Sequence, residues 1–379
     1  MMKTKLSEIL QNFQKKDTLF KTPEQLLLCK GSCKRFRIEY NDPSKFKDEM
    51  IKLQQQYKTQ MMIAAIPFDG RTKATIIVPE KLERYDKCRL IMDLQVTTHP
   101  LMIEQSQTIP DKEQFSEMVR KAINFINDQH FNKVVLARTL NFHLKDNPPI
   151  SSWLTNLLYK NNQGYIFSMG TDDCQTLIGA SPELLVKKDG AMVTINPLAG
   201  SRKQTFNKIK DAYLEKELLN SDKDLYEHKI VVDYMCEKLH PYLSDIEFNQ
   251  RPEILYTDTM IHLSTVIKGK LTNNTMDALD LAQLLHPTPA ICGEPQKQSL
   301  HFIQEIEPFN RGFYTGLVGY MDSNGDGEWV IAIRCAAIED KKVTLFAGAG
   351  IVNNSVPNSE YNEISAKLTT MLDAMELKE

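Results

Sequence analysis

The stretch that decides the fold runs from Lys133 to Asn196 and reads KVVLARTLNFHLKDNPPISSWLTNLLYKNNQGYIFSMGTDDCQTLIGASPELLVKKDGAMVTIN. From Lys133 to Phe142, apolar side chains recur in the alternating manner of a strand. Short strand-like runs follow at 165–169, 176–180, 184–187 and 192–196, separated by Gly, Asp and Pro. Strands this close in sequence pair as antiparallel hairpins. The pattern therefore disfavours βαβ units and a doubly wound nucleotide-binding fold.

Helical and strand-like segments extend this pattern in both directions. Apolar residues at steps of three and four predict helices over 111–127 and 206–220, a third helix that is capped at Ser221 or Asp222 and ends before Pro241, and a last helix from Ser359. Residues 1–60 look like polar helical segments and loops, and 80–110 carry no strong signal. Further strands are expected at 61–68, 75–79, 260–268, 312–321, 329–338 and 342–347.

No repeat and no linker rich in Gly, Ser or Pro divides the chain. The sequence therefore predicts an α+β fold, a single large body in which antiparallel β-sheets pack against helices. Within this body we expect residues 1–110 to form an N-terminal α/β part and residues 111–379 to carry the catalytic groups.

Composition narrows the class of function. Hydrophobic residues make up 42% of the 379 and charged residues 25%, which is typical of a globular protein. The net charge of −3 argues against nucleic acid and against a polybasic membrane anchor. The longest apolar runs are too short to span a bilayer, and the first residues show no secretory signal. Seven scattered cysteines without a CxxC predict free thiols, so we expect a cytoplasmic protein.

Three familiar kinds of site fail on inspection. The run Asp322–Gly327 begins like an EF-hand loop, but Ile333 stands at the twelfth position, where calcium needs a bidentate carboxylate. A hairpin tip explains this run better. The Gly348–Gly350 segment lacks the third glycine and the following helix of a dinucleotide fingerprint. Gly-x-Ser-x-Gly and zinc-spaced histidine pairs are absent, which disfavours serine hydrolases and zinc enzymes.

Two acidic pairs stand out on predicted helices. Glu360 and Glu363 share one helical arc with Lys367, and Asp224 and Glu227 lie one turn apart at the start of another helix. An ordinary surface ion pair and a favourable helix-dipole position explain each pair alone. Facing each other, however, the four carboxylates would form the oxygen-rich kind of site that magnesium takes, completed by water and an anionic substrate.

Charged residues also occur inside apolar runs. Lys133 opens a strongly apolar strand, Arg334 lies in the run 330–336, and Glu183 has small or apolar neighbours. A buried Arg needs an anion, which an internal carboxylate or a ligand can supply equally well. The glycines of 346–351 allow backbone N–H groups to approach an anionic ligand.

Taken in order, the motifs from about Lys133 to Leu372 resemble those of the chorismate-utilising enzymes, most closely the isochorismate synthases. The resemblance implies a chorismate-binding catalytic region over 111–379, a magnesium-dependent isomerase that acts on chorismate, and a monomer. It rests on the following segments: 133–138 (KVVLAR), 179–185 (GASPELL), 197–202 (PLAGSR), 224–228 (DLYEH), 286–293 (HPTPAICG), 311–316 (RGFYTG), 332–336 (AIRCA), 347–351 (AGAGI) and 359–367 (SEYNEISAK).

The resemblance also implies a division of labour. Water attacks C2 of chorismate and the C4 hydroxyl leaves, with Lys133 as the general base and Glu183 as the general acid. Lys133 must be neutral to take a proton, so its pKa has to fall from about 10.4, whereas the pKa of Glu183 has to rise. Glu227 and Glu363 correspond to the principal magnesium ligands. Glu360 and Asp224 correspond to partners reached through water.

The substrate-binding residues implied by the resemblance come from several segments. Arg334, Tyr314 and the backbone from Gly348 to Gly350 correspond to groups that hold the enolpyruvyl carboxylate. The remaining positions correspond to groups around the ring: Ser201, His262, Ala290 and Lys367. Without the resemblance, His262 between Ile261 and Leu263 would be taken as a core histidine.

Alternatives within and outside this family stay open. Anthranilate synthases carry glutamine where Lys133 stands, and aminodeoxychorismate synthases carry a lysine motif that 197–201 lacks. A salicylate synthase that releases pyruvate keeps the equivalents of both Lys133 and Glu183, and the 286–293 motif is the main argument against it. For an isochorismate synthase, siderophore biosynthesis is favoured over menaquinone biosynthesis. A non-catalytic chorismate-binding subunit would have no need of base, acid and metal ligands together.

Overall fold

Two large sheets face each other in the computed structural model, which describes residues 3–11, 13–31, 33–99, 101–161, 163–172, 174–273 and 275–378. Met1 and Met2, where the sequence shows no secretory signal, lie outside these ranges. The strands of both sheets pair antiparallel, as the closely spaced runs predicted. The predicted α+β fold of one body with antiparallel sheets is confirmed.

The first sheet has the strand order β20–β10–β24–β23–β12–β11–β2–β3–β7, and β9 also pairs with β10. Its strands are β2 Thr18–Lys21, β3 Gln25–Cys29, β7 Leu82–Asp86, β9 Ile103–Ile109, β10 Lys133–Leu144, β11 Tyr165–Gly170, β12 Gln175–Ser181, β20 Gly293–Glu294, β23 Cys335–Glu339 and β24 Lys342–Ile351.

The second sheet has the order β16–β19–β14–β13–β22–β21–β5–β6–β4. Its strands are β4 Cys33–Ile38, β5 Met61–Ile66, β6 Ala74–Pro79, β13 Leu184–Asp189, β14 Met192–Asn196, β16 Leu243–Glu247, β19 Ile267–Leu271, β21 Leu317–Asp322 and β22 Gly327–Ile331. A small sheet, β15–β18–β17, consists of β15 Leu198–Lys203, β18 Met260–Ser264 and β17 Glu253–Tyr256, and β1 Thr4–Lys5 pairs parallel with β8 Leu90–Ile91.

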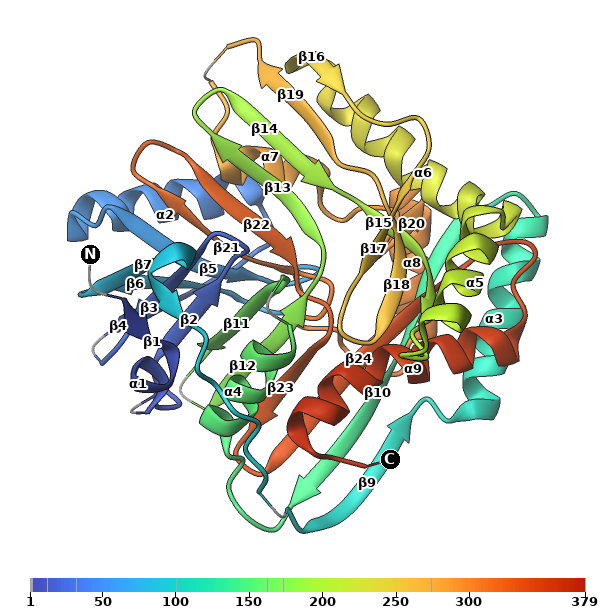
Figure 1. Cartoon of the computed structure of the whole chain (residues 1–379). Helices are drawn as coiled ribbons and strands as arrows, with labels where there is room; N and C mark the ends of the chain where they lie inside the picture. The colour runs from blue at the N-terminus through green and yellow to red at the C-terminus, as the bar shows by residue number, and fades with distance from the viewer. Residues whose placement is uncertain are drawn as a thin grey trace.

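Helices cover the outer faces of both large sheets (Figure 1). Alternate residues of the strands point outward to these helices and inward to the other sheet: in β5, Ile63 and Ala65 join the core between the sheets, whereas Met62 and Ala64 pack against α2 and its neighbours. The helices on the first sheet are α1 Leu6–Leu10, α3 Lys112–Asn127, α4 Ile150–Lys160, α8 Gln296–Ile306 and α9 Pro357–Met375. Those on the second are α2 Pro43–Tyr57, α6 Asp222–Leu239 and α7 Ala278–Leu285, with α5 Lys208–Leu219 beside α6.

Helix starts follow their capping residues. Asp111 and Gln114 form a capping box at the start of α3, and Ser221 caps α6 by accepting a hydrogen bond from Asp224 N. Both of these predicted boundaries are confirmed. None of the helices in the described ranges is long and apolar enough to cross a membrane. All seven cysteines are described, and each is a free thiol.

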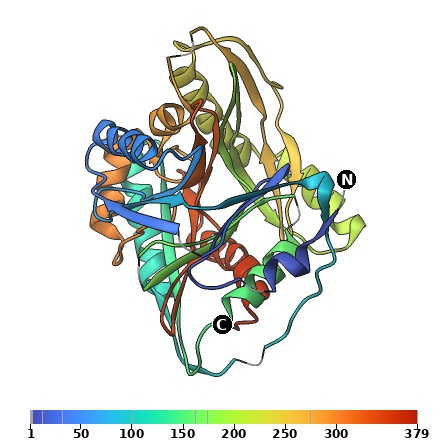
Figure 2. The same cartoon turned by 90° about the vertical axis from the view of Figure 1, so that its left-hand side faces the viewer.

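The N-terminal expectation was wrong in part. Residues 1–60 contain α2, but Thr18–Lys21 and Gln25–Cys29 are buried strands and Cys33–Ile38 is an edge strand. Strands of four or five residues are too short to show an alternation, and buried Gln25 hides the pattern further because its amide donates to Tyr320 Oη at 2.6 Å. Figure 2 shows the blue N-terminal strands within the body of the molecule, where β2 pairs with β11 from the middle of the chain.

Three predicted strands are interrupted where the chain turns or changes sheet. The stretch 312–321 becomes a strand only at Leu317, because Gly312 and Thr315 have φ of 56° and 60°. The stretch 260–268 divides into β18 and β19, which belong to different sheets. The stretch 329–338 divides into β22 and β23, and Arg334 between them has φ of 49°. The chain thus crosses from the second sheet to the first at Arg334.

A second crossing lies next to the first. The chain leaves β12 of the first sheet at Ser181 and enters β13 of the second at Leu184, so Glu183 stands between the sheets. Glu183 and Arg334, two charged residues within apolar stretches of the sequence, therefore lie where the chain passes from one sheet to the other.

Candidate active site

A central cavity of about 60 Å³ lies at these crossings. Nine of the thirteen predicted site residues line it: Glu183, Ser201, Glu227, His262, Ala290, Tyr314, Arg334, Gly348 and Lys367. Lys133 and Glu363 lie beside it, each in contact with a lining residue. Residues more than 200 positions apart in the sequence thus lie around one cavity.

Glu183 is a buried carboxyl, with 5% of its surface exposed. Burial raises its pKa to about 7, although the positive charges of Arg334, Lys133 and Lys367 act in the opposite direction. Its backbone N–H donates to Ser181 Oγ at 3.1 Å, which fixes the crossing segment. A carboxyl group with this pKa holds a proton that it can give up near neutral pH.

Lys133 is fully buried at the start of β10. Its Nζ lies 2.9 Å from Glu227 Oε1, but the geometry is that of an ion pair without a hydrogen bond, so Nζ has no hydrogen-bond acceptor. Gly350 makes this arrangement possible. A methyl group there would overlap the Glu227 carboxylate and lie 2.9 Å from Lys133 Cε.

Each of the other three predicted metal-site acids has a cation of its own. Glu363 Oε1 lies 2.6 Å from Lys367 Nζ, Glu360 Oε1 lies 2.7 Å from Lys223 Nζ, and Asp224 Oδ2 lies 2.8 Å from Arg202 Nη2. Burial opposes the charge on Lys223, but Glu360, Glu227 and Glu363 together raise its pKa. Three carboxylates therefore surround one ammonium group.

The acids respond differently to this crowding. Burial and the neighbouring Glu363 raise the pKa of Glu360. Burial also acts against the charge on Glu363, but Lys367, Lys223 and Ser201 outweigh it and lower its pKa. Glu360 Oε2 is buried without a hydrogen-bond partner. This unpartnered oxygen and the four neighbouring carboxylates fit a divalent cation that would replace part of the positive charge.

The acids alone do not complete a metal site. Within the described ranges, no group of three or more His, Cys, Asp and Glu side chains is arranged to hold a metal ion. Magnesium does not require such a group, since it usually binds one or two carboxylates and takes its other oxygens from water and substrate. The donor set agrees with that type of site.

Other residues of the central cavity present donors for an anion. Arg334 is 8% exposed, and among the described residues its guanidinium has no hydrogen bond or ion pair. Tyr314 stacks on Phe346 with ring centroids 5.2 Å apart, and a methyl group on Gly348 would lie 2.9 Å from its Oη. Lys367 Nζ donates to Gly348 O at 3.0 Å. An unpaired buried guanidinium is costly unless a ligand anion completes it.

Ser201 and His262 come from paired strands of the small sheet. Ser201 Oγ donates to Glu363 Oε1 at 3.3 Å, which ties that sheet to α9. His262 is buried with Nε2 unpartnered, and burial together with Arg334 and Lys367 lowers its pKa, so it is neutral. Ala290 adds a small apolar wall.

A buried pair behind the cavity was missed by the sequence argument. Arg311 donates to both carboxylate oxygens of Glu307, to Val135 O and Ile291 O at 2.8 Å each, and to Thr315 Oγ1. Glu307 in turn accepts from Ala137 N at 2.9 Å. The pair therefore joins three walls of the site. In the sequence Arg311 stands out only as part of the 311–316 motif, and no local pattern shows which residues it contacts.

Lys223 was also missed, although a signal for it exists. A lysine in the first turn of a helix is disfavoured by the helix dipole, and Lys223 is there followed by Asp224. Such a cost calls for a nearby anion, and Glu360 supplies it.

Comparison with known proteins agrees with this geometry. Residues 6–376 match the model of the family described as chorismate binding enzyme. The isochorismate synthase DhbC of Bacillus subtilis is 37% identical, over 98% of this chain and 96% of that protein. The isochorismate synthase MenF of the same organism is 38% identical, over 70% of this chain and 56% of that protein. The crystal structure of DhbC from Bacillus anthracis, described as a 2,3-dihydroxybenzoate-specific isochorismate synthase, aligns with a TM-score of 0.89 and 35% identity, over 98% of this chain and 99% of that one.

Proposed function

Because the chain belongs to the chorismate-binding enzyme family, we propose that it is an isochorismate synthase that interconverts chorismate and isochorismate. The observation that carries the proposal is that Glu183, a carboxyl group whose pKa burial raises to about 7, lines the central cavity, and that the buried Lys133 lies beside it against Glu227. Relatives with this activity match nearly the whole length of the chain.

Lys133 would act as the general base. Its Nζ makes no hydrogen bond, so in its neutral form the lone pair can take a proton from a water molecule that attacks C2 of the ring. The ion pair with Glu227 has to loosen first, because a lysine accepts a proton only through the lone pair of its neutral form. A second cation for Glu227 would favour that step.

Glu183 would act as the general acid. In the window around pH 7 it is partly protonated, and it protonates the C4 hydroxyl as that group leaves. Arg334, Lys133 and Lys367 would stabilise the carboxylate that remains after the transfer. In this proposal the base Lys133 acts at C2 and the acid Glu183 acts at C4 of the same ring.

Magnesium would be held by Glu227 and Glu363, with Glu360 and Asp224 as partners through water. The ion would supply positive charge to the ring carboxylate of chorismate in a site that is otherwise rich in acids. Arg334, Tyr314 and the Gly348–Gly350 backbone would take the enolpyruvyl carboxylate. Ser201, His262, Ala290 and Lys367 would surround the ring.

We also propose that the product serves siderophore biosynthesis. DhbC-type relatives match nearly end to end, whereas MenF of Bacillus subtilis is matched over 56% of its length. A cytoplasmic monomer that acts on chorismate without nucleic acid or membrane partners is the corresponding expectation.

Product analysis after incubation with chorismate, with and without Mg²⁺, tests the activity. Isochorismate without pyruvate is the expected result. Salicylate with pyruvate would replace the proposal by a salicylate synthase, and chorismate binding without any product would replace it by a binding subunit.

A further inference from the structure

A second cavity lies directly outside the central one. It measures about 230 Å³, compared with about 60 Å³ for the central cavity, and Pro182 and Arg334 line both. The two cavities therefore share a wall at the crossings between the sheets. No role in the proposed reaction is assigned to the outer cavity.

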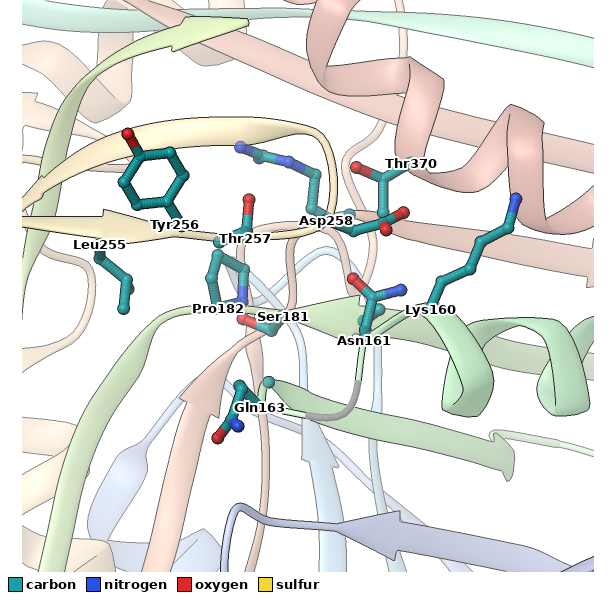
Figure 3. A pocket seen from close by; sticks show the side chains of 13 residues that line it. Lys160, Asn161, Gln163, Ser181, Pro182, Leu255, Tyr256, Thr257, Asp258 and Thr370 are labelled. Atoms are coloured by element: carbon teal, nitrogen blue, oxygen red, sulfur yellow. The ribbon is translucent and has the colours of Figure 1, made fainter. Parts of the chain in front are cut away.

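Four parts of the molecule surround this outer cavity (Figure 3). Leu255 and Asp258 come from the end of β17 and the turn that follows it, and Lys160 ends α4. Thr370 lies on α9, and Pro182 belongs to the crossing between β12 and β13. Figure 3 shows Asp258, Thr370 and Asn161 gathered on one side, with Leu255 and Tyr256 on the other. Lys160 reaches α9, where its Nζ donates to Asp373 O at 3.0 Å.

The charges of the outer cavity suit an anion in transit. Lys160 and Arg334 are cations, and Asp258 is the one acid among the described lining residues. Burial raises the pKa of Asp258, while Lys160 acts against this rise and Asp373 adds to it. Arg334 at the inner end has no ion pair or hydrogen bond among the described residues, so an entering carboxylate meets a vacant guanidinium.

We propose that the outer cavity is the passage through which chorismate reaches the central cavity, with Arg334 as the residue that receives its trailing carboxylate. This inference rests on the proposed function. The ring end leads, because the acids that would hold a cation for the ring carboxylate do not line the outer cavity, whereas Glu227 among them lines the central one. The enolpyruvyl end then stays at Arg334, between the two cavities.

Binding kinetics test the passage. Surface plasmon resonance with wild-type protein and chorismate in Mg²⁺ buffer gives the association and dissociation rate constants. Leu255→Trp puts an indole into the passage, and we expect both rate constants to fall by about tenfold or more while Kd changes less than about threefold. Gln250→Trp, at an exposed loop position that does not line the cavity, is the matched control. Unchanged rate constants in Leu255→Trp, or faster dissociation alone, would overturn the passage.

A charge pair tests the same idea without adding bulk. Asp258→Asn should raise the association rate constant by about twofold or more at low ionic strength, Lys160→Gln should lower it by a similar factor, and added salt should shrink both effects. Identical rate constants and salt dependence in both variants would contradict the proposal. If wild-type protein neither binds nor converts chorismate, the proposed function fails; if it does both and the variants behave like wild type, only the passage fails.

Discussion

The two walls of the central cavity differ in whether their charged side chains form ion pairs. On the α6–α9 wall, each of the four carboxylates lies against a lysine or an arginine. On the wall formed by the crossings, Glu183 and Arg334 have no ion pair, either with each other or with another described residue. The neighbouring cations lower the pKa of Glu363 on the first wall, whereas burial raises the pKa of Glu183 on the second to about 7.

This difference shows how one small cavity provides two chemistries. Paired carboxylates can exchange one cation for another, which suits a metal site. An isolated carboxyl group exchanges a proton, which suits an acid catalyst. Substitutions can remove this difference between the ion-paired carboxylates and the unpaired Glu183, or measure its effect on activity and stability.

Removing the base or the acid should have the largest effect. Lys133→Ala and Glu183→Gln should each lower kcat by about 10³-fold, because each removes the group proposed for one of the two proton transfers. Steady-state conversion of chorismate measures the loss, and a cooperative unfolding transition shows that each variant is folded. Turnover close to wild type in either variant would remove the acid–base scheme.

Removing one acid from the paired wall should change the response to magnesium. Glu227→Ala and Glu363→Ala should raise the Mg²⁺ concentration for half-maximal activity by about tenfold or more, because each deletes a proposed ligand. Glu247→Ala, at an exposed strand position, is the control. Magnesium titrations that superimpose on wild type would refute the assigned ligands.

Crowding the paired wall should disturb Lys133 and Glu227 together. Gly350→Ala places a methyl group against the Glu227 carboxylate, and we expect kcat to fall by about 10²-fold. Glu227→Asp in the same chain withdraws the carboxylate and should restore part of the loss. Wild-type kcat in Gly350→Ala would mean that this close packing has no role in activity.

The isolated acid should lower stability at high pH. The folded form keeps the proton of Glu183 up to about pH 7, whereas an unfolded glutamate loses it near 4.5. Folding stability therefore falls as pH rises from about 4.5 to about 7, by about 3 kcal/mol in total. Glu183→Gln removes this cost.

Denaturant unfolding at several pH values measures the effect. Glu183→Gln should be more stable than wild type above about pH 7 and equal to it near pH 4. Glu247→Gln, whose side chain is exposed, should show no such dependence. If the free energy of unfolding of wild type and of Glu183→Gln changed with pH in the same way, the raised pKa of the buried Glu183 carboxyl group would be contradicted.

The smallest effect should come from the ammonium inside the acidic cluster. Lys223→Met removes the cation that faces Glu360, so Mg²⁺ should bind about threefold more tightly by calorimetry. Without Mg²⁺ the variant should have a lower Tm, which Mg²⁺ restores. Weaker Mg²⁺ binding would show that Lys223 supports the metal site instead of competing with the metal.

The candidate site residues have clearer signals in the local sequence than the strand breaks around them. Lys133, Glu183 and Arg334 were found because a charge in an apolar run is costly, and that cost has a local signature. The break at Arg334 had no such signature, since Val330–Ala336 is apolar on both sides of it. Only pairing with two different sheets divides this run.

The Arg311–Glu307 pair and the N-terminal strands were out of reach for a related reason. The partners of Arg311 lie as far away as Val135, and β2 and β5 pair with β11 and β21. Such contacts depend on the complete topology. A short segment has no local sequence pattern that reveals these long-range contacts. The helices of 111–127 and 222–239, in contrast, are visible in the sequence through their capping residues and the spacing of their apolar residues.

The place of β5 in the second sheet has a consequence for synthesis of the chain. Met61–Ile66 leaves the ribosome early, but its neighbour β21 is made only near the end. During translation the hairpin β5–β6 exposes an apolar edge and an apolar face for most of that time. A nascent chain of this kind depends on rapid closure after release, or on a chaperone that covers the hairpin until β21 arrives.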